Sequence, residues 1–251
     1  MQIFYDIGLL QTYLNTLRSS NIIGFVPTMG ALHRGHISLI KHAKQKCNVV
    51  VVSIFVNPTQ FGPNEDFSDY PRTLKDDIKK LQENDVDILF CPNNESIYPK
   101  NIPLVDVNIP TWDSLYCGKS RPGFFKGICG VVLRLFNIIQ PNIAIFGLKD
   151  FQQYKIIETL VEELFLNITV IACPIIREDN GLAMSSRNKY LTPSQFTDAA
   201  SIFKSLNNAK IQFKNGKITT GTEIKHLVSQ QLSESIKIDY CVVIDPTSLK
   251  E

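Results

Sequence analysis

A nearly unbroken run of apolar, β-branched residues most constrains the fold of this chain. Residues 49–57 read Val-Val-Val-Val-Ser-Ile-Phe-Val-Asn, and the run lacks the polar–apolar alternation of a half-exposed strand. A strand that is apolar on both faces is typical of a parallel sheet covered by helices on both sides. This run therefore predicts an α/β protein.

Strand and helix patterns alternate through the first two-thirds of the chain, which indicates a Rossmann-like, doubly wound parallel sheet. Strands are expected at 22–28, 49–57, 87–91, 143–146 and 168–173, and helices at 36–46, 73–83, 127–140 and 151–165. Ligands bind beyond the carboxyl ends of the strands in such sheets. The loops that follow these strands are therefore where we expect a functional site.

The pattern changes near residue 175, where a polar loop replaces the alternation. Two helices are expected at 193–213 and 222–233, the first with Thr192 as its N-cap and Pro193 in its first turn. A final strand is expected at 237–245, where apolar residues alternate. We therefore expect two domains, residues 1–175 and a smaller α+β C-terminal domain of residues 176–251.

Composition excludes several classes of protein. The chain has 251 residues, 44% hydrophobic and 20% charged, and a net charge of +2, which gives no electrostatic reason to expect a nucleic-acid or membrane partner. Neither a signal peptide nor a run of about 20 apolar residues is visible. The six cysteines form no CxxC pair, so we expect buried thiols in a reducing cytoplasm and no metal site. They are Cys47, Cys91, Cys117, Cys129, Cys173 and Cys241.

Two histidines lie where the first expected strand gives way to a helix. Residues 27–36 read Pro-Thr-Met-Gly-Ala-Leu-His-Arg-Gly-His, with Gly35 between His33 and His36. Unpaired backbone N–H groups and the helix dipole make such a junction an anion site. The histidines could instead have a structural role, or they could both bind a metal ion. Two histidines alone do not complete a metal site. We therefore interpret this segment as a phosphate-binding loop.

Three further polar segments follow expected strands. Asn57 and Gln60 carry amides that could bond a hydroxyl or a carboxylate, although a simple turn would look similar. Lys149 could neutralise phosphate charge, whereas the neighbouring Asp150 could simply cap a helix. Residues 184–188 read Met-Ser-Ser-Arg-Asn and suit phosphate oxygens, as would many polar loops.

Taken together, these segments resemble the pantothenate synthetase (pantoate–β-alanine ligase) family of the HIGH-motif nucleotidyltransferases, from about residue 25 to 245. The resemblance implies an ATP-dependent ligase that condenses pantoate with β-alanine through a pantoyl adenylate, releasing AMP and pyrophosphate. It also implies Mg²⁺ carried on the phosphates of ATP and a homodimer formed through the larger domain.

The resemblance also implies site residues, with His36 the better candidate proton donor. Catalytic roles fall on His33, His36, Lys149 and Arg187. Nucleotide contacts fall on Met29, Gly30, His33, Gly35, His36, Gly147, Leu148, Lys149, Asp150, Ile176, Met184, Ser185, Ser186 and Arg187. Substrate contacts fall on Asn57, Gln60, Arg121 and Gln153.

Two departures from the family pattern stand out. Phe124 occupies a position where the family usually has histidine, and Lys80 one where it has glutamine. Asp76 and Asp77 could approach Mg²⁺, but acidic residues on an amphipathic helix more often face solvent, and no metal ligand is assigned. Two rival interpretations remain open, another nucleotidyltransferase and a non-catalytic nucleotide-binding protein.

Overall fold

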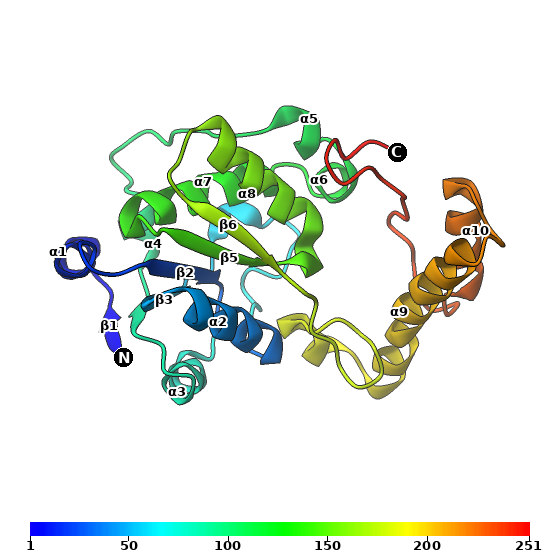
Figure 1. Ribbon diagram of the computed structural model, residues 1–251, viewed down its shortest axis with the longest axis horizontal. Helices are drawn as coiled ribbons and strands as arrows, with labels where there is room; N and C mark the ends of the chain where they lie inside the picture. The colour runs from blue at the N-terminus through cyan, green and yellow to red at the C-terminus, as the bar shows by residue number, and fades with distance from the viewer. The chain divides into compact units, whose positions relative to one another are not determined.

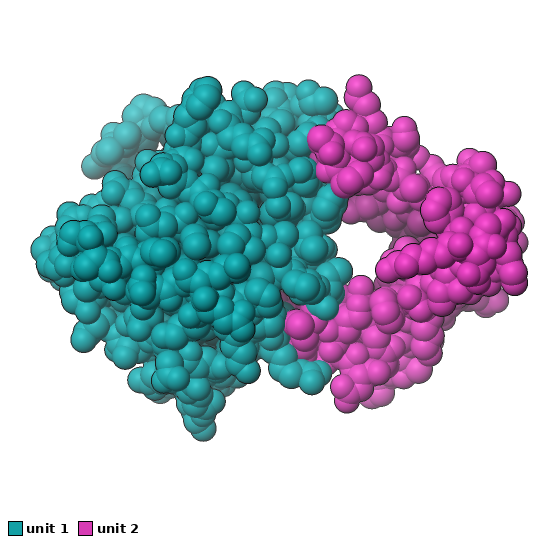
Figure 2. Space-filling view, in the orientation of Figure 1, with its two compact units in different colours: residues 1–175 teal, residues 176–251 magenta.

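The computed structural model describes residues 1–251 as two compact units, Met1–Ile175 and Ile176–Glu251, which Figure 2 colours separately. This division falls at the position where the sequence pattern changes. No helix in the chain is both long and apolar enough to cross a bilayer.

The first unit is built on a six-stranded sheet in which every neighbouring pair of strands is parallel. Its strands are β1 (Gln2–Phe4), β2 (Ile23–Thr28), β3 (Val49–Ile54), β4 (Ile88–Phe90), β5 (Ile143–Gly147) and β6 (Thr169–Cys173). The order in space is β1-β4-β3-β2-β5-β6. The direction of the strand order reverses between β2 and β5, which makes their carboxyl ends the switch point of a Rossmann-like sheet. The predicted fold class is confirmed.

Helices cover both faces of this sheet (Figure 1). The core on one face gathers α1 (Ile7–Leu17), α7 (Phe124–Ile139) and α8 (Phe151–Glu163), and the core on the other gathers α2 (Arg34–Lys46) and α3 (Leu74–Glu83). β3 supplies both cores, Val51 to the first and Val50 with Val52 to the second. The apolar run therefore forms the two-sided buried strand that its composition predicts.

Short helical segments connect the main elements. They are η1 (Pro58–Gln60), α4 (Asn94–Ile97), α5 (Pro110–Asp113), α6 (Tyr116–Ser120) and η2 (Leu148–Asp150). All six cysteines are free thiols, and Cys91, Cys129 and Cys173 are buried. Burial raises the thiol pKa of Cys91 and of Cys129 to about 12, so both stay protonated and unreactive.

The second unit contains η3 (Ser186–Tyr190), α9 (Pro193–Lys214) and α10 (Gly221–Gln231). Thr192 caps α9 as predicted, in a capping box with Gln195. The predicted strand at 237–245 is wrong, because this segment has no strand beside it and the unit's only β-pairing is an isolated bridge between Arg177 and Ala183. The expected α+β composition therefore lacks its strand, and Ile238 and Tyr240 stay exposed.

A glycine lets α7 approach η1 at backbone contact. A Cβ placed on Gly127 would lie 2.2 Å from the Thr59 carbonyl oxygen and 2.8 Å from the Gln60 nitrogen. Both atoms belong to main chain that cannot rotate away, so only glycine fits at this position. The close approach fixes the turn that carries Gln60 against α7.

We predict that Gly127→Ala destabilises the fold by about 1–3 kcal/mol or more, because the added methyl group overpacks a backbone contact. Urea denaturation measures the loss. Gly130→Ala is the matched control on the same helix, since its Cβ would meet only the flexible end of Arg134, at 3.3 Å. Equal effects of the two substitutions would contradict the prediction.

Candidate active site

The two segments predicted to bind phosphate meet at the switch point of the sheet. His33 is the N-cap of α2, directly beyond β2, and Lys149 lies in η2, directly beyond β5. Burial, His33 and then Lys149 lower the pKa of His36, so the Lys149 ammonium lies within electrostatic reach of the His36 ring. The fold therefore joins His33, His36 and Lys149 into one basic site.

A tight turn carries the histidines, and a buried carboxylate from α3 holds it. Gly30 and Ala31 both adopt left-handed backbone, with φ of 82° and 49°. The Asp77 carboxylate accepts hydrogen bonds from the backbone N–H of Ala31 at 2.9 Å and of Leu32 at 2.8 Å. Asp77 is fully buried, so the expectation that it faces solvent is wrong.

The two imidazole rings share one hydrogen-bonding pattern. The Nδ1 of His33 accepts from the Gly35 N–H at 3.1 Å, and the Nδ1 of His36 accepts from the His33 N–H at 3.3 Å. The ring centroids are 4.1 Å apart. Because each Nδ1 is an acceptor, each neutral ring carries its proton on Nε2.

The protonation of His36 follows from its surroundings. Burial, reinforced by the nearby His33, Lys149 and Lys80, lowers the pKa of His36 to about 3. The ring is therefore neutral at pH 7. A neutral ring offers one hydrogen-bond donor, its Nε2–H, and the role of His36 as a proton donor stays a prediction.

The backbone of this loop offers less to an anion than its sequence suggests. The Gly30 N–H donates to the Thr28 hydroxyl, and the Ile37 N–H donates to the His33 carbonyl. The N–H groups of residues 31, 32, 33 and 35 are likewise engaged within the protein. The cradle of unpaired N–H groups expected here is therefore largely filled, which leaves imidazole and ammonium groups as the available donors.

The amide pair after β3 forms a second cluster. The Asn57 side chain donates to the Gln60 Oε1 at 3.0 Å and to the Gly127 carbonyl at 3.2 Å, and it accepts from the Tyr98 hydroxyl at 2.7 Å. The Gln60 Nε2 donates to the Met29 sulfur at 3.1 Å, which is a weak acceptor. Asn57 therefore orients Gln60, whose NH₂ group keeps a partner that a substrate oxygen could replace.

Arg121 is held beside this cluster. Its guanidinium makes a two-pronged pair with Glu65, at 2.6 and 2.5 Å, and donates to the Gln60 carbonyl at 3.3 Å. It also lies 3.6 Å from the centre of the Phe124 ring. The phenyl ring, present where the family usually has histidine, thus stacks on the arginine.

The other predicted residues fall into two groups. In the first unit, Lys149 pairs with Asp150 at 3.2 Å, and Asp150 makes no capping bond to α8. In the second unit, the Met184 N–H bonds the Ile176 carbonyl at 3.0 Å, and the Ser185 hydroxyl caps η3 by accepting from the Arg187 N–H at 3.2 Å. The remaining predicted positions are Gly147 and Leu148 beside Lys149, Gln153 in the first turn of α8, and Ser186 at the start of η3.

The side chains do not form a metal cage. No group of three or more His, Cys, Asp or Glu residues could hold a metal ion. The Asp77 carboxylate already accepts three hydrogen bonds, the third from the Thr73 hydroxyl at 3.1 Å, while Asp76 is exposed. A protein-bound Mg²⁺ does not fit this donor set.

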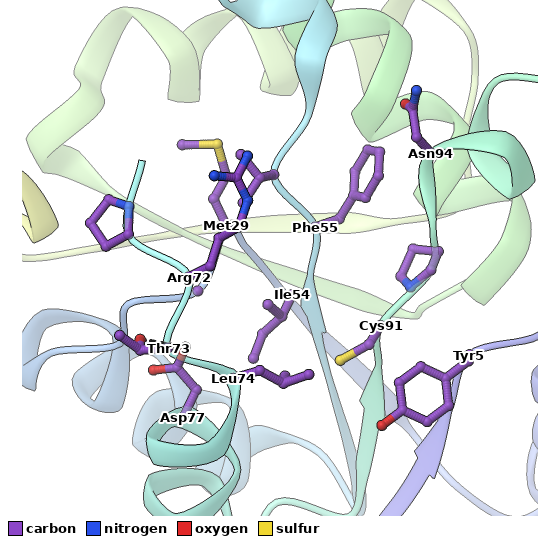
Figure 3. Close-up of a pocket in the computed structure, with 14 residues that line it drawn as sticks. Tyr5, Met29, Ile54, Phe55, Arg72, Thr73, Leu74, Asp77, Cys91 and Asn94 are labelled. Carbon is purple, nitrogen blue, oxygen red and sulfur yellow. Dashed lines mark hydrogen bonds between the residues drawn. The ribbon is translucent and has the colours of Figure 1, made fainter. Parts of the chain in front are cut away.

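A cavity of about 340 Å³ adjoins the loop at the carboxyl ends of β3 and β4. In Figure 3, Thr73 and Asp77 stand on one side of it and Tyr5 and Cys91 on the other. Met29 and Gly30 also line it, so the cavity borders the histidine-bearing turn.

The fold is that of a Rossmann-like α/β enzyme, a class in which ligands bind at the switch point of the sheet, and the cluster of His33, His36 and Lys149 lies at this point. The family model described as pantoate-beta-alanine ligase matches residues 2–251. A pantothenate synthetase of Pseudothermotoga lettingae is 44% identical over 252 residues, covering 100% of this chain and 89% of the relative. The chain belongs to the pantoate–β-alanine ligase family of carbon–nitrogen ligases.

Solved structures agree with this assignment. The pantothenate synthetase of Thermus thermophilus superposes with a TM-score of 0.93 at 38% identity, over 99% of this chain and 89% of its own. A pantoate-beta-alanine ligase of Francisella tularensis, solved in complex with β,γ-ATP and β-alanine, has a TM-score of 0.80 at 42% identity, over 92% and 86%.

The lowered pKa of His36 predicts a pH dependence of stability. Below the unfolded pKa of about 6.5 the unfolded chain binds a proton that the folded ring does not take up until about pH 3. The stability that the neutral ring supports is therefore full above pH 6.5 and falls toward pH 3, by up to about 1.4 kcal/mol per pH unit. Urea denaturation from pH 7.5 to 4.5 measures the slope. His36→Gln removes this titration and should flatten the slope, and identical slopes would contradict the assignment.

Proposed function

We propose that this ligase joins pantoate to β-alanine in two steps at the switch point of the sheet. The pantoate carboxylate attacks the α-phosphorus of ATP, forming pantoyl adenylate and releasing pyrophosphate. The β-alanine amine then attacks the acyl carbon, forming the amide of pantothenate and releasing AMP and the amine proton. The observation that carries the proposal is the convergence of His33, His36 and Lys149 at one site.

The basic site stabilises charge that develops on the phosphates. The Nε2–H groups of His33 and His36 donate hydrogen bonds to phosphate oxygens, and Lys149 supplies a positive charge. Such donors, already oriented before the reaction, stabilise developing negative charge without reorganising. Met29, Gly30, Gly35 and the residues around Lys149 shape the rest of the nucleotide site.

The amide cluster receives pantoate. The Gln60 NH₂ group exchanges its weak sulfur partner for a pantoate oxygen, while Asn57 and Gly127 keep the turn in place. Gln153 adds an amide from the first turn of α8. Arg121, now paired with Glu65, is a carboxylate-binding group beside Gln60.

The two units divide the work. Residues 1–175 bind ATP and pantoate, and residues 176–251 act as a lid. In the lid, Ile176 and Met184 contact the nucleotide, while Ser185, Ser186 and Arg187 hold the triphosphate and the leaving pyrophosphate. Mg²⁺ would bind the phosphates of ATP and few protein ligands, since the acidic side chains fit a metal poorly. The enzyme is a cytoplasmic homodimer whose only substrates are small molecules.

His36→Ala should lower pantoate-dependent ATP–pyrophosphate exchange by about 10²–10³-fold, the loss typical of one oriented transition-state donor. His42→Ala is the control, because His42 lies on the same helix and the hydrogen bond of its ring goes to the Ser38 carbonyl, one turn earlier in α2. A wild-type exchange rate in His36→Ala would refute the role of the ring. The exchange assay on the unmodified protein separates a ligase from a non-catalytic nucleotide-binding protein.

Gln60→Ala should raise the KM for pantoate about tenfold while changing the KM for ATP much less, since the amide contacts pantoate alone. Steady-state kinetics with each substrate varied in turn gives the two values. Gln82→Ala, at an exposed position of α3, is the control. A larger change in the KM for ATP would move Gln60 out of the pantoate site.

A further inference from the structure

One face of α3 contacts the turn that carries the histidines. Asp77 and Lys80 are three residues apart on this helix and therefore point from the same face. Asp77 accepts from two backbone N–H groups of the turn, and Lys80 donates to the Leu32 carbonyl at 2.7 Å. Asp77 and Lys80 thus bind two N–H groups and one carbonyl group of the same short segment, Ala31 and Leu32.

The turn needs such support because its backbone is strained. Ala31 is an L-residue in left-handed conformation, in which its Cβ crowds the following carbonyl oxygen. Its N–H and that of Leu32 both point at the Asp77 carboxylate, which is itself fixed by the Thr73 hydroxyl. Strain of this kind persists only where surrounding contacts hold it.

The position of the Leu32–His33 peptide group determines the positions of the His33 and His36 rings. Its carbonyl belongs to the peptide group that carries the His33 N–H, and this N–H donates to the Nδ1 of His36. A shift of this peptide group would therefore move the His33 ring and release the acceptor bond that orients the His36 ring. Lys80 also lies near the His36 ring, because its charge contributes to the lowered pKa there.

A role of Asp77 as a metal ligand competes poorly with these contacts. Its oxygens accept from Ala31, Leu32 and Thr73, and it is fully buried among them. A metal ion would have to displace bonds that hold the turn. The carboxylate is therefore already committed to the protein main chain.

We propose that Asp77 and Lys80 are positioning residues of this ligase, which hold the Gly30–Leu32 turn so that the Nε2–H groups of His33 and His36 face the reacting phosphates. Neither side chain touches substrate in this role. The inference rests on the proposed function of the two histidines, and its test separates the two.

The experiment compares Asp77→Asn and Lys80→Met with matched controls on the same helix. Asparagine keeps one acceptor but turns an NH₂ group toward a backbone N–H, and methionine keeps the length of lysine without its donors. Glu83→Gln and Lys79→Met are the controls. Both wild-type side chains are exposed, and the long 3.9 Å distance between the Lys79 Nζ and the Glu83 Oε1 marks a weak ion pair. Thermal denaturation confirms that each variant is folded.

Pantoate-dependent ATP–pyrophosphate exchange, with pantoate, ATP and Mg²⁺ varied in turn, is the first readout. In Asp77→Asn and Lys80→Met we expect kcat to fall on the order of tenfold to a hundredfold, as misplaced catalytic groups do, with a smaller change in the KM for pantoate. The controls should match wild type. Wild-type kcat in both test variants would overturn the proposal, and so would recovery of Asp77→Asn by excess Mg²⁺, which would make Asp77 a metal ligand.

The nitrogen shifts of His36 in a long-range ¹H–¹⁵N spectrum are the second readout. Wild type should show a bare Nδ1 and a protonated Nε2, and the two test variants should lose this single tautomer. A slow variant that keeps the wild-type His36 spectrum would overturn positioning through the turn. If His36→Ala keeps full activity, the proposed role of the ring fails, whereas the spectra still decide whether α3 holds the turn.

Discussion

A buried carboxylate under a strained turn is the contact on which this site depends. Asp77 satisfies two N–H groups of a left-handed turn, and the histidines that follow satisfy the next ones themselves. Most of the anion-binding capacity of the helix N-terminus is thereby used within the protein. The donors that remain at this site are side chains, two imidazoles and a lysine, in place of a generic cradle of backbone amides.

The sequence predicted those parts of the fold that depend on periodicity. Residues 49–57 predicted a doubly buried strand, and β3 is one. The sequence did not predict β1, because a three-residue strand carries almost no periodic signal. β1 forms by pairing with β4, and its Gln2 lies opposite Ile88, 86 positions away in the chain. The strand expected at 237–245 failed for the opposite reason, since alternation alone cannot form a strand that has no partner beside it.

The site was predictable only in part, and the division follows the range of the contacts. His33, His36 and Lys149 stood out because strand ends and local motifs marked them. The use of Asp77 was invisible, since its partners in the turn lie 45 and 46 positions away along the chain. The same holds for Asn57, whose amide bonds Gly127, 70 positions away. Side chains that act on distant main chain leave no local pattern to read.

The strand order also determines when this enzyme acquires its site. β2 and β5 are neighbours in space, yet the Ile23 N–H bonds the Asn142 side chain, 119 positions away in sequence. Closing so long a loop is entropically costly before the contacts form, and topologies rich in distant pairings fold slowly. We therefore expect the basic site to assemble late, after the halves of the sheet have met. During synthesis, a chain that ends before β5 already contains both histidines but cannot yet form the site, because Lys149 follows β5.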